Sequence, residues 1–378
     1  STMLGPANVP ATRLARPITE LAPDGLTRVH LSDSGATAVE IALKTAIQYW
    51  ANLGQPDKQR ILGFHNNYHG DTLGAMAVAP DALFHWPFLT MLPDHPRVSY
   101  PTSPPCPLVT PDMACDPAAL DGVRQILAAE ADRIAAVIIE PVQGAGGIHP
   151  APPGFLRGLR ALCDEFDVLL IVDEVATGFG RTGWPFACHA ENVTPDLLCI
   201  GKGLTGGYLP VAATVATEAI FEAFLGPIDQ RLTLYHGHSY AGNQLGCAAA
   251  LANIELCADL WPTLPAKVMA LADLVRAFVE APYVGPIRQR GMMVGFEVMA
   301  DPGGGRRFDW ALRAGYAVTE SARRRGLLVR PIGSTIILMP PLISTEAELS
   351  AMVDILRAAV DDAEPILRAW ARGEAVTA

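Results

Sequence analysis

The sequence predicts an α/β fold with a mainly parallel sheet flanked by helices, followed by a smaller α/β C-terminal domain. Short apolar runs alternate with segments of helical periodicity through most of the chain. Charged residues stand directly behind several of these runs, which is typical of the sheet edge that binds ligands. The pattern breaks at residues 261–265. We therefore expect a larger domain at 1–262 and a smaller one at 263–378.

Apolar spacing predicts each element in turn, with period 3.6 for helices and short bounded runs for strands. The expected helices span residues 11–22, 38–50, 117–130, 154–166, 244–257, 266–280, 310–325 and 346–363. The expected strands span residues 27–31, 60–64, 135–139, 168–172, 197–200, 211–216, 292–298, 327–329 and 335–339. Helices between successive strands favour parallel pairing, because parallel strands need long crossover connections.

The composition limits the classes of partner. With 28 Lys and Arg against 39 Asp and Glu, the net charge of −11 argues against nucleic acid or an anionic membrane. Seven cysteines without a CxxC pair favour reduced thiols and no metal site. The first residues, STMLGPANVP, lack the pattern of a signal peptide, and no apolar run is long enough to span a membrane. We expect a cytoplasmic protein.

A carboxylate and an amine follow two of the predicted strands. Asp173 comes directly after residues 168–172, and Lys202, flanked by glycines, lies two positions beyond residues 197–200. Together at one sheet edge they suit a cofactor with a basic ring nitrogen and an aldehyde, and pyridoxal phosphate is such a cofactor. Taken singly, Lys202 is also compatible with a solvated lysine, and Asp173 with a helix N-cap.

Other turns at the same edge carry residues suited to binding. Ser34 and Gly35 open a predicted helix and can cradle an anion, although an ordinary capped helix has the same pattern. Tyr68 lies in a turn after residues 60–64 and can stack on a planar ring, although such a turn is often only a turn. Glu140 precedes a glycine-rich loop, and residues 235–243 form a second candidate phosphate-binding turn.

Six segments, in order, resemble the motifs of the class III aminotransferases, which have the fold-type I pyridoxal-phosphate architecture. They are SDSGATAVEIALK, NYHGDT, EPVQGAGG, VDEVATGFGRTG, GKGLTGG and HGHSYAGNQLGCAAA. Within that class, GLLVRPIG and LMPPL resemble the 7,8-diaminononanoate synthases of biotin biosynthesis. In that family the enzyme transfers an amino group to 8-amino-7-oxononanoate, from S-adenosylmethionine or, in some members, from lysine.

The resemblance implies roles for individual residues. Lys202 is the lysine that holds the cofactor aldehyde, Asp173 pairs the ring nitrogen, and Arg330 grips the substrate carboxylate. Ser239 reaches the cofactor phosphate from the neighbouring subunit, which implies a homodimer with shared active sites. The remaining implied cofactor contacts are Ser34, Gly35, Ala36, Tyr68, His69, Glu140 and Val175, and Tyr68 and Gly237 are also expected to contact substrate.

The sequence departs from the family pattern in ways that keep alternatives open. The N-terminal segment that precedes Ser1 in family members is absent here. His238-Ser239-Tyr240 stands where adenosylmethionine users have Pro-Thr-Phe, which favours the lysine-using branch. One alternative is a class III enzyme for ω-amino acids or diamines. Another is a truncated, catalytically silent protein that only binds pyridoxal phosphate.

Overall fold

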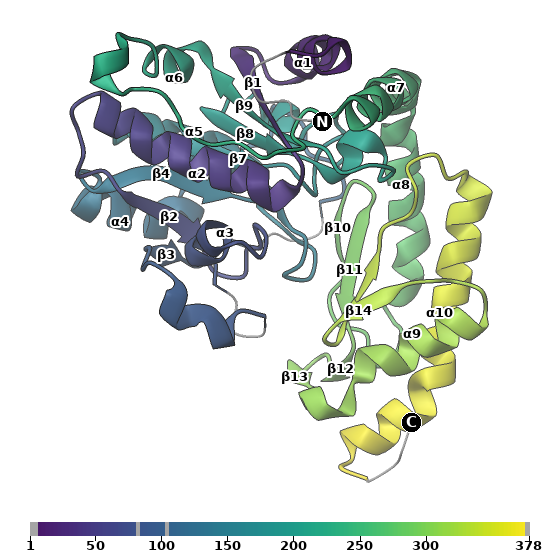
Figure 1. Cartoon of the computed structure of the whole chain (residues 1–378). Coiled ribbons are helices and arrows are strands. Elements are labelled where there is room, and N and C mark those ends of the chain that lie inside the picture. The colour runs from purple at the N-terminus through teal and green to yellow at the C-terminus, as the bar shows by residue number, and fades with distance from the viewer. Residues whose placement is uncertain (1–6, 81–83, 103–105, 375–378) are drawn as a thin grey trace.

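A seven-stranded sheet forms the centre of the molecule (Figure 1). The structure is a computed structural model that describes residues 7–80, 84–102 and 106–374, so residues 1–6 of the N-terminal stretch lie outside it. The strand order is β1-β9-β8-β7-β4-β2-β3. These strands span Leu26–Ser32 (β1), Arg60–Phe64 (β2), Arg97–Val98 (β3), Ile134–Ile139 (β4), Leu169–Asp173 (β7), Leu197–Ile200 (β8) and Ala212–Thr217 (β9).

The strands from β8 to β3 are parallel to one another, and only the pairs that β9 makes with β8 and β1 are antiparallel. The helices are α1 (Val9–Leu21), α2 (Gly35–Asn52), α3 (Leu73–Val78), α4 (Asp121–Glu130), α5 (Phe155–Glu165), α6 (Glu218–Glu222), α7 (Gln244–Leu260), α8 (Leu264–Val275), α9 (Ala314–Arg324) and α10 (Glu346–Ala371). The predicted mainly parallel sheet flanked by helices is confirmed, with antiparallel pairs at β9.

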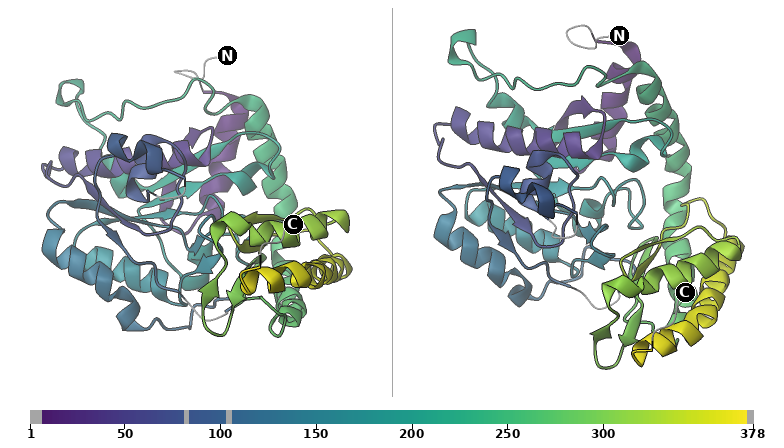
Figure 2. Two further views of the ribbon diagram at one scale, coloured as in Figure 1. Left: turned by 90° about the horizontal axis from the view of Figure 1, so that it is seen from below. Right: turned by 60° about the horizontal axis from the view of Figure 1, so that its bottom comes forward.

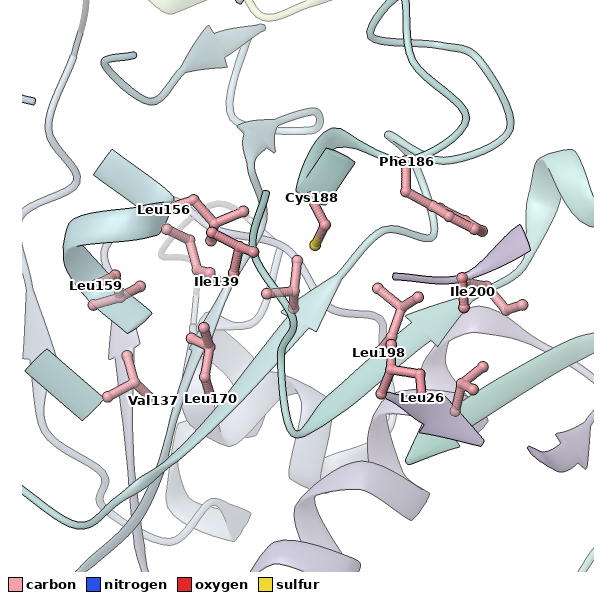
Figure 3. Packing of buried hydrophobic residues seen from close by; sticks show 14 of the residues in the cluster. Leu26, Val137, Ile139, Leu156, Leu159, Leu170, Phe186, Cys188, Leu198 and Ile200 are labelled. Carbon is pink, nitrogen blue, oxygen red and sulfur yellow. The ribbon is translucent and has the colours of Figure 1, made fainter. Parts of the chain in front are cut away.

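The central strands β4, β7 and β8 each bury one set of side chains on each face of the sheet. Val137 and Leu170 belong to the cluster beneath α1, α4, α5 and α7, whereas Ala136 and Ile171 belong to the cluster beneath α2 and α3. Figure 3 shows part of the first cluster, in which side chains from β4, β7 and β8 meet those of α5. Burial on both faces explains why these strands are apolar throughout rather than alternating.

The C-terminal part forms a second core around a small antiparallel sheet, beside the large sheet (Figure 2). Its strands, in the order β10-β11-β15-β14, span Arg288–Arg290, Met293–Glu297, Thr335–Leu338 and Arg330–Ile332. Two further hairpins pair β5 (Val142–Gln143) with β6 (His149–Pro150) and β12 (Met299–Asp301) with β13 (Arg306–Arg307). The last buried residue of the core around the large sheet is Ala250, and the first of the second core is Val268. We therefore keep the domain limits 1–262 and 263–378 as a proposal.

One local prediction was wrong. Residues 327–329 are not a strand, since the pairing with β15 begins at Arg330. Their apolar character has another cause, because they line a cavity.

The break predicted at residues 261–265 coincides with the end of α7 at Leu260. A 3-10 turn at Trp261–Thr263 separates α7 from α8, and its proline and the next one occupy first-turn positions, where no N–H group is needed.

None of the helices in the described ranges is long and apolar enough to cross a membrane.

Candidate active site

A cavity of about 340 Å³ lies at the carboxyl ends of the central strands, and we call it the smaller cavity. Strands β4 and β7 end in or just before a carboxylate, and β8 ends two residues before a lysine. Parallel strands bring these ends to one edge. Most of the predicted site residues therefore line one cavity: Gly35, Ala36, Tyr68, His69, Glu140, Asp173, Val175 and Lys202.

The first turn of α2 forms one wall of the smaller cavity. Ser34 is the N-cap, and its side chain accepts from the backbone N–H of Thr37 in a capping box. A Cβ atom on Gly35 would lie 2.5 Å from Cγ1 of Val175, so only glycine allows α2 to approach the loop after β7. The positive end of this 18-residue helix therefore faces the smaller cavity and favours an anion there.

Asp173 and His69 form a buried pair. The Nδ1 atom of His69 lies 2.7 Å from Oδ2 of Asp173, and Oδ1 of Asp173 accepts from the backbone N–H of Val175. Residues 174–177 form turns and no helix, so the alternative of a helix N-cap at Asp173 is wrong. The imidazole orients one carboxylate oxygen and the backbone orients the other, which leaves the carboxylate fixed at the edge of the smaller cavity.

Lys202 differs from the chain's other lysines. Lys44 contacts Nδ1 of His236, Lys58 donates to the Asp167 carbonyl, and Lys267 donates to the Leu342 carbonyl. Among the described residues, the Lys202 ammonium has no ion-pair or hydrogen-bond partner, and its side chain is exposed beside the cavity. Its φ of 33° lies in the left-handed region, a strained backbone typical of functional positions.

Tyr68 and Glu140 are joined at the entrance of the smaller cavity. Oε2 of Glu140 accepts from the Tyr68 backbone N–H at 2.7 Å, and Oε1 accepts from the Gly144 N–H at 3.3 Å. The Tyr68 hydroxyl donates to Asp71, and burial raises the pKa of Tyr68 to about 12. Burial also raises the pKa of Glu140 to about 7, against the opposing effects of His69 and the two N–H donors.

The raised pKa of Glu140 predicts a pH-dependent stability of the apoprotein. Between pH 4.5 and about 7 the folded state keeps a proton that the unfolded state releases, so the free energy of unfolding should fall as pH rises. The loss should be about 3 kcal/mol at most. In Glu140→Gln this slope should disappear, and urea denaturation of both proteins at several pH values measures it.

A matched control is Glu165→Gln, because Glu165 is exposed and its hydrogen bond to Arg124 lowers the pKa instead. That variant should keep the fall in the free energy of unfolding between pH 4.5 and about 7, because Glu140 is unchanged in it. If the free energies of unfolding of the wild type and Glu140→Gln changed with pH in the same way, Glu140 would have an ordinary pKa in the folded state, and the prediction would be wrong.

A larger cavity of about 730 Å³ adjoins the smaller one and shares Tyr68, Asp71, Glu140, Ala176 and Lys202 with it. Its walls come mainly from apolar residues of the C-terminal part, and besides Lys202 its only cation among the described residues is Arg330.

Several residues that line the larger cavity were not predicted to belong to a site: Asp71, Phe84, Met293, Leu338, Met339 and Met352. The two segments GLLVRPIG and LMPPL were the signals in the sequence that pointed to this wall.

A family model described as aminotransferase class-III matches residues 2–360. The chain belongs to the class-III aminotransferases. Curated relatives named adenosylmethionine-8-amino-7-oxononanoate aminotransferase include that of Anoxybacillus flavithermus, 46% identical over 95% of this chain and 80% of the relative. The relative of the same name from Geobacter sulfurreducens is 43% identical, with the same coverage.

Solved structures resemble this aminotransferase over nearly its whole length. The adenosylmethionine-8-amino-7-oxononanoate aminotransferase of Methanocaldococcus jannaschii superposes with a TM-score of 0.89 at 39% identity, covering 96% of this chain and 81% of that one. An amine transaminase from an uncultivated Pseudomonas species, in its PLP-bound form, gives 0.85 at 35% identity, covering 95% and 82%.

Three predicted residues of the aminotransferase line neither cavity: Ser34, which directly precedes Gly35 at the start of α2, Gly237 and Ser239. Gly237 and Ser239 are exposed in a segment that runs along α2, where Gln48 donates to the Leu232 carbonyl. The single chain therefore does not bring Ser239 to the residues that line the smaller cavity.

Proposed function

We propose that this aminotransferase transfers an amino group to 8-amino-7-oxononanoate, giving 7,8-diaminononanoate, with pyridoxal 5'-phosphate as cofactor and S-adenosylmethionine as donor. The observation that carries the proposal is the larger cavity, whose lining is mostly apolar and includes both the Arg330 cation and Lys202. An acceptor with a carboxylate at one end of a methylene chain and a ketone towards the other suits this lining. The names of relatives 40–46% identical over most of the chain support the same reaction and donor.

The smaller cavity fits the cofactor. The helix end at Gly35 and Ala36 suits a phosphate, Asp173 suits a ring nitrogen, and Lys202 suits an aldehyde. The Nε2 atom of His69 is buried without a hydrogen-bond partner among the described residues. The His69–Asp173 pair therefore has one polar atom left for a bound group. When bound, pyridoxal phosphate supplies an electron-withdrawing ring that carries the amino group between the two substrates.

Each of the chain's own residues would have a separate role. The Asp173 carboxylate would hold a proton on the ring nitrogen, and His69 keeps that carboxylate in place. The Lys202 amine would hold the cofactor aldehyde between turnovers and would take the proton from the substrate carbon as general base and return one as general acid. The Tyr68 ring would stack on the cofactor ring, and the apolar lining of the larger cavity would exclude water from the reacting carbon.

Half-reactions test the assignment. The purified protein, loaded with pyridoxal phosphate, is mixed with S-adenosylmethionine, lysine or a diamine, and the loss of the cofactor's long-wavelength absorbance is followed by stopped flow. We expect the fastest loss with S-adenosylmethionine, and recovery on adding 8-amino-7-oxononanoate. Lysine as the faster donor would instead agree with the residues at 238–240. No change with any amine would identify a silent cofactor-binding protein.

A second candidate is an ω-amino acid or amine transaminase. It is favoured by an omega-aminotransferase of Caulobacter vibrioides, 34% identical over 92% of this chain and 79% of that one. Recovery with pyruvate or 2-oxoglutarate but not with 8-amino-7-oxononanoate would support this candidate and reject the first.

Replacing Arg330 with methionine should raise the KM for 8-amino-7-oxononanoate by about ten- to hundred-fold, the loss expected for one charge-assisted hydrogen bond. The rate constant of the half-reaction with the donor should change little, provided that the donor carboxylate binds elsewhere. Steady-state kinetics with varied acceptor measures the effect. Arg324→Met is the control, because Arg324 is an exposed cation on α9 that lines neither cavity. An unchanged KM in Arg330→Met would remove Arg330 from the substrate site.

The protein also works, in our proposal, as a cytoplasmic homodimer in which Ser239 completes the partner's phosphate site. Ser239 is flanked by the strongly exposed Tyr235 and Tyr240, and Leu245 is exposed nearby, as expected of a surface covered by a second copy. Seven free thiols agree with a reducing compartment. Sedimentation of the wild type, and cofactor loss in Ser239→Ala, test the dimer and the shared site.

A further inference from the structure

The glycine-rich loop after β5 forms part of the larger cavity's wall through Gly144 and Ala145. At its far end the backbone is strained, because Ile148, a β-branched residue, has a φ of 56° in the left-handed region. Such a conformation persists only when its surroundings hold it. The contacts that hold this loop therefore determine the position of the cavity wall.

Arg288 of β10 holds the strained end of the loop. Its Nε atom donates to the carbonyls of Gly147 and Ile148, both at 3.1 Å, and its Nη2 atom donates to the Gly147 carbonyl at 2.7 Å. Among the described residues no carboxylate lies within ion-pair distance of Arg288, and burial lowers its pKa. The guanidinium thus faces two backbone carbonyls rather than an acid.

Packing between the loop and the small sheet leaves little freedom for the loop to shift. A Cβ atom on Gly295 of β11 would lie 2.9 Å from the Gly147 carbonyl oxygen, so the strand and the loop are in close contact. The Ile148 side chain is buried with Val142 and Met293 in a small cluster, and Met293 lines the larger cavity.

A continuous series of hydrogen bonds runs from Arg288 to Tyr68. The Gly147 N–H donates to the Gly144 carbonyl at 3.2 Å and so closes the turn that Arg288 holds. The Gly144 N–H donates to Oε1 of Glu140, whose Oε2 accepts from the Tyr68 N–H. Arg288 and Arg330 also lie in the same small sheet, on its two outer strands.

We propose that Arg288 is a positioning residue that fixes the Gly144–Gly147 loop, and with it the wall of the larger cavity, relative to Arg330 on the same sheet. It contacts neither cavity itself, and it acts on the acceptor through the loop. The wall would contact the acceptor in the ground state and in the transition state alike. Displacing the wall would therefore weaken binding equally in both states, which raises KM and leaves kcat unchanged.

The test is steady-state kinetics of Arg288→Met, which keeps the apolar stem and removes every donor. We expect a KM for the acceptor that is about ten- to hundred-fold higher, with kcat within about three-fold of wild type. The dissociation constant of pyridoxal phosphate, measured on the apoprotein by fluorescence, should stay within about three-fold, since Gly35, Asp173 and Lys202 of the smaller cavity have no contact with Arg288 or its loop in the described contacts. Arg288→Lys, which keeps one donor for the Gly147 carbonyl, should recover part of the KM.

Arg307→Met is the matched control, because Arg307 is an exposed cation of the same domain that pairs with Glu297 and does not touch the loop. An unchanged KM in Arg288→Met, an equal rise in Arg307→Met, or a fall in kcat and thermal stability without recovery in Arg288→Lys would each overturn the proposal. The inference rests on the proposed function only for the choice of acceptor. If the wild type rejects 8-amino-7-oxononanoate, the proposed function fails, and the same variants are compared with the acceptor that the wild type uses.

Discussion

Replacing Lys202 with alanine is expected to lower amino transfer by about 10⁴-fold, the upper range for loss of a proton-transferring side chain. Lys202 is the lysine that lines both cavities without a partner among the described residues. In the proposed mechanism its loss removes both the amine that holds the cofactor and the base at the reacting carbon. Single-turnover rates with S-adenosylmethionine measure the chemical step, and borohydride treatment followed by peptide mass spectrometry locates the lysine that carries the cofactor.

The control is Lys44→Ala, because Lys44 is exposed on α2 and contacts only His236 in the described contacts. It should keep the activity and the borohydride product of the wild type. Added methylamine should restore part of the rate in Lys202→Ala, since a free amine can act as the missing base. Cofactor attached at Lys44 or Lys267 after borohydride would contradict the assignment.

Much of the sheet edge could be predicted from the sequence because its signals are local. The runs before Glu140, Asp173 and Lys202 are short, apolar and bounded by polar or glycine residues, and each of them forms a buried strand. Because parallel strands all end at the same edge of the sheet, the residues that follow them in the sequence lie together at that edge. Ser34 was predictable as an N-cap for the same local reason.

The remaining features depend on contacts between distant segments. The pair between His69 and Asp173 joins the loop after β2 to the last residue of β7, and no spacing rule gives its 2.7 Å separation. The run at 327–329 has the composition of a strand, but its apolar side chains line a cavity instead of a sheet. Ser239 lies away from both cavities of the single chain, so its proposed role needs a second chain.

Replacing Asp173 with asparagine is expected to lower kcat/KM by about 10²- to 10³-fold, the usual cost of removing one fixed electrostatic stabiliser. Asparagine has nearly the same shape, and its one acceptor oxygen can keep the hydrogen bond from the Val175 N–H, whereas its NH2 group would face Nδ1 of His69 and can only donate to it. It cannot carry the negative charge that keeps a ring nitrogen protonated, so the ring would withdraw fewer electrons from the reacting carbon. Single-turnover rates with the donor measure this loss directly.

The charge and the shape of Asp173 can be separated, because Asp173→Glu keeps the carboxylate and displaces it. If the charge is what matters, Asp173→Glu should retain more activity than Asp173→Asn, whereas both variants should bind pyridoxal phosphate with similar affinity. Asp164→Asn serves as the control, since Asp164 is exposed on α5 and pairs with Arg160. Equal activity of Asp173→Asn and the wild type would mean that the ring nitrogen needs no anion, and that the buried pair with His69 is only structural.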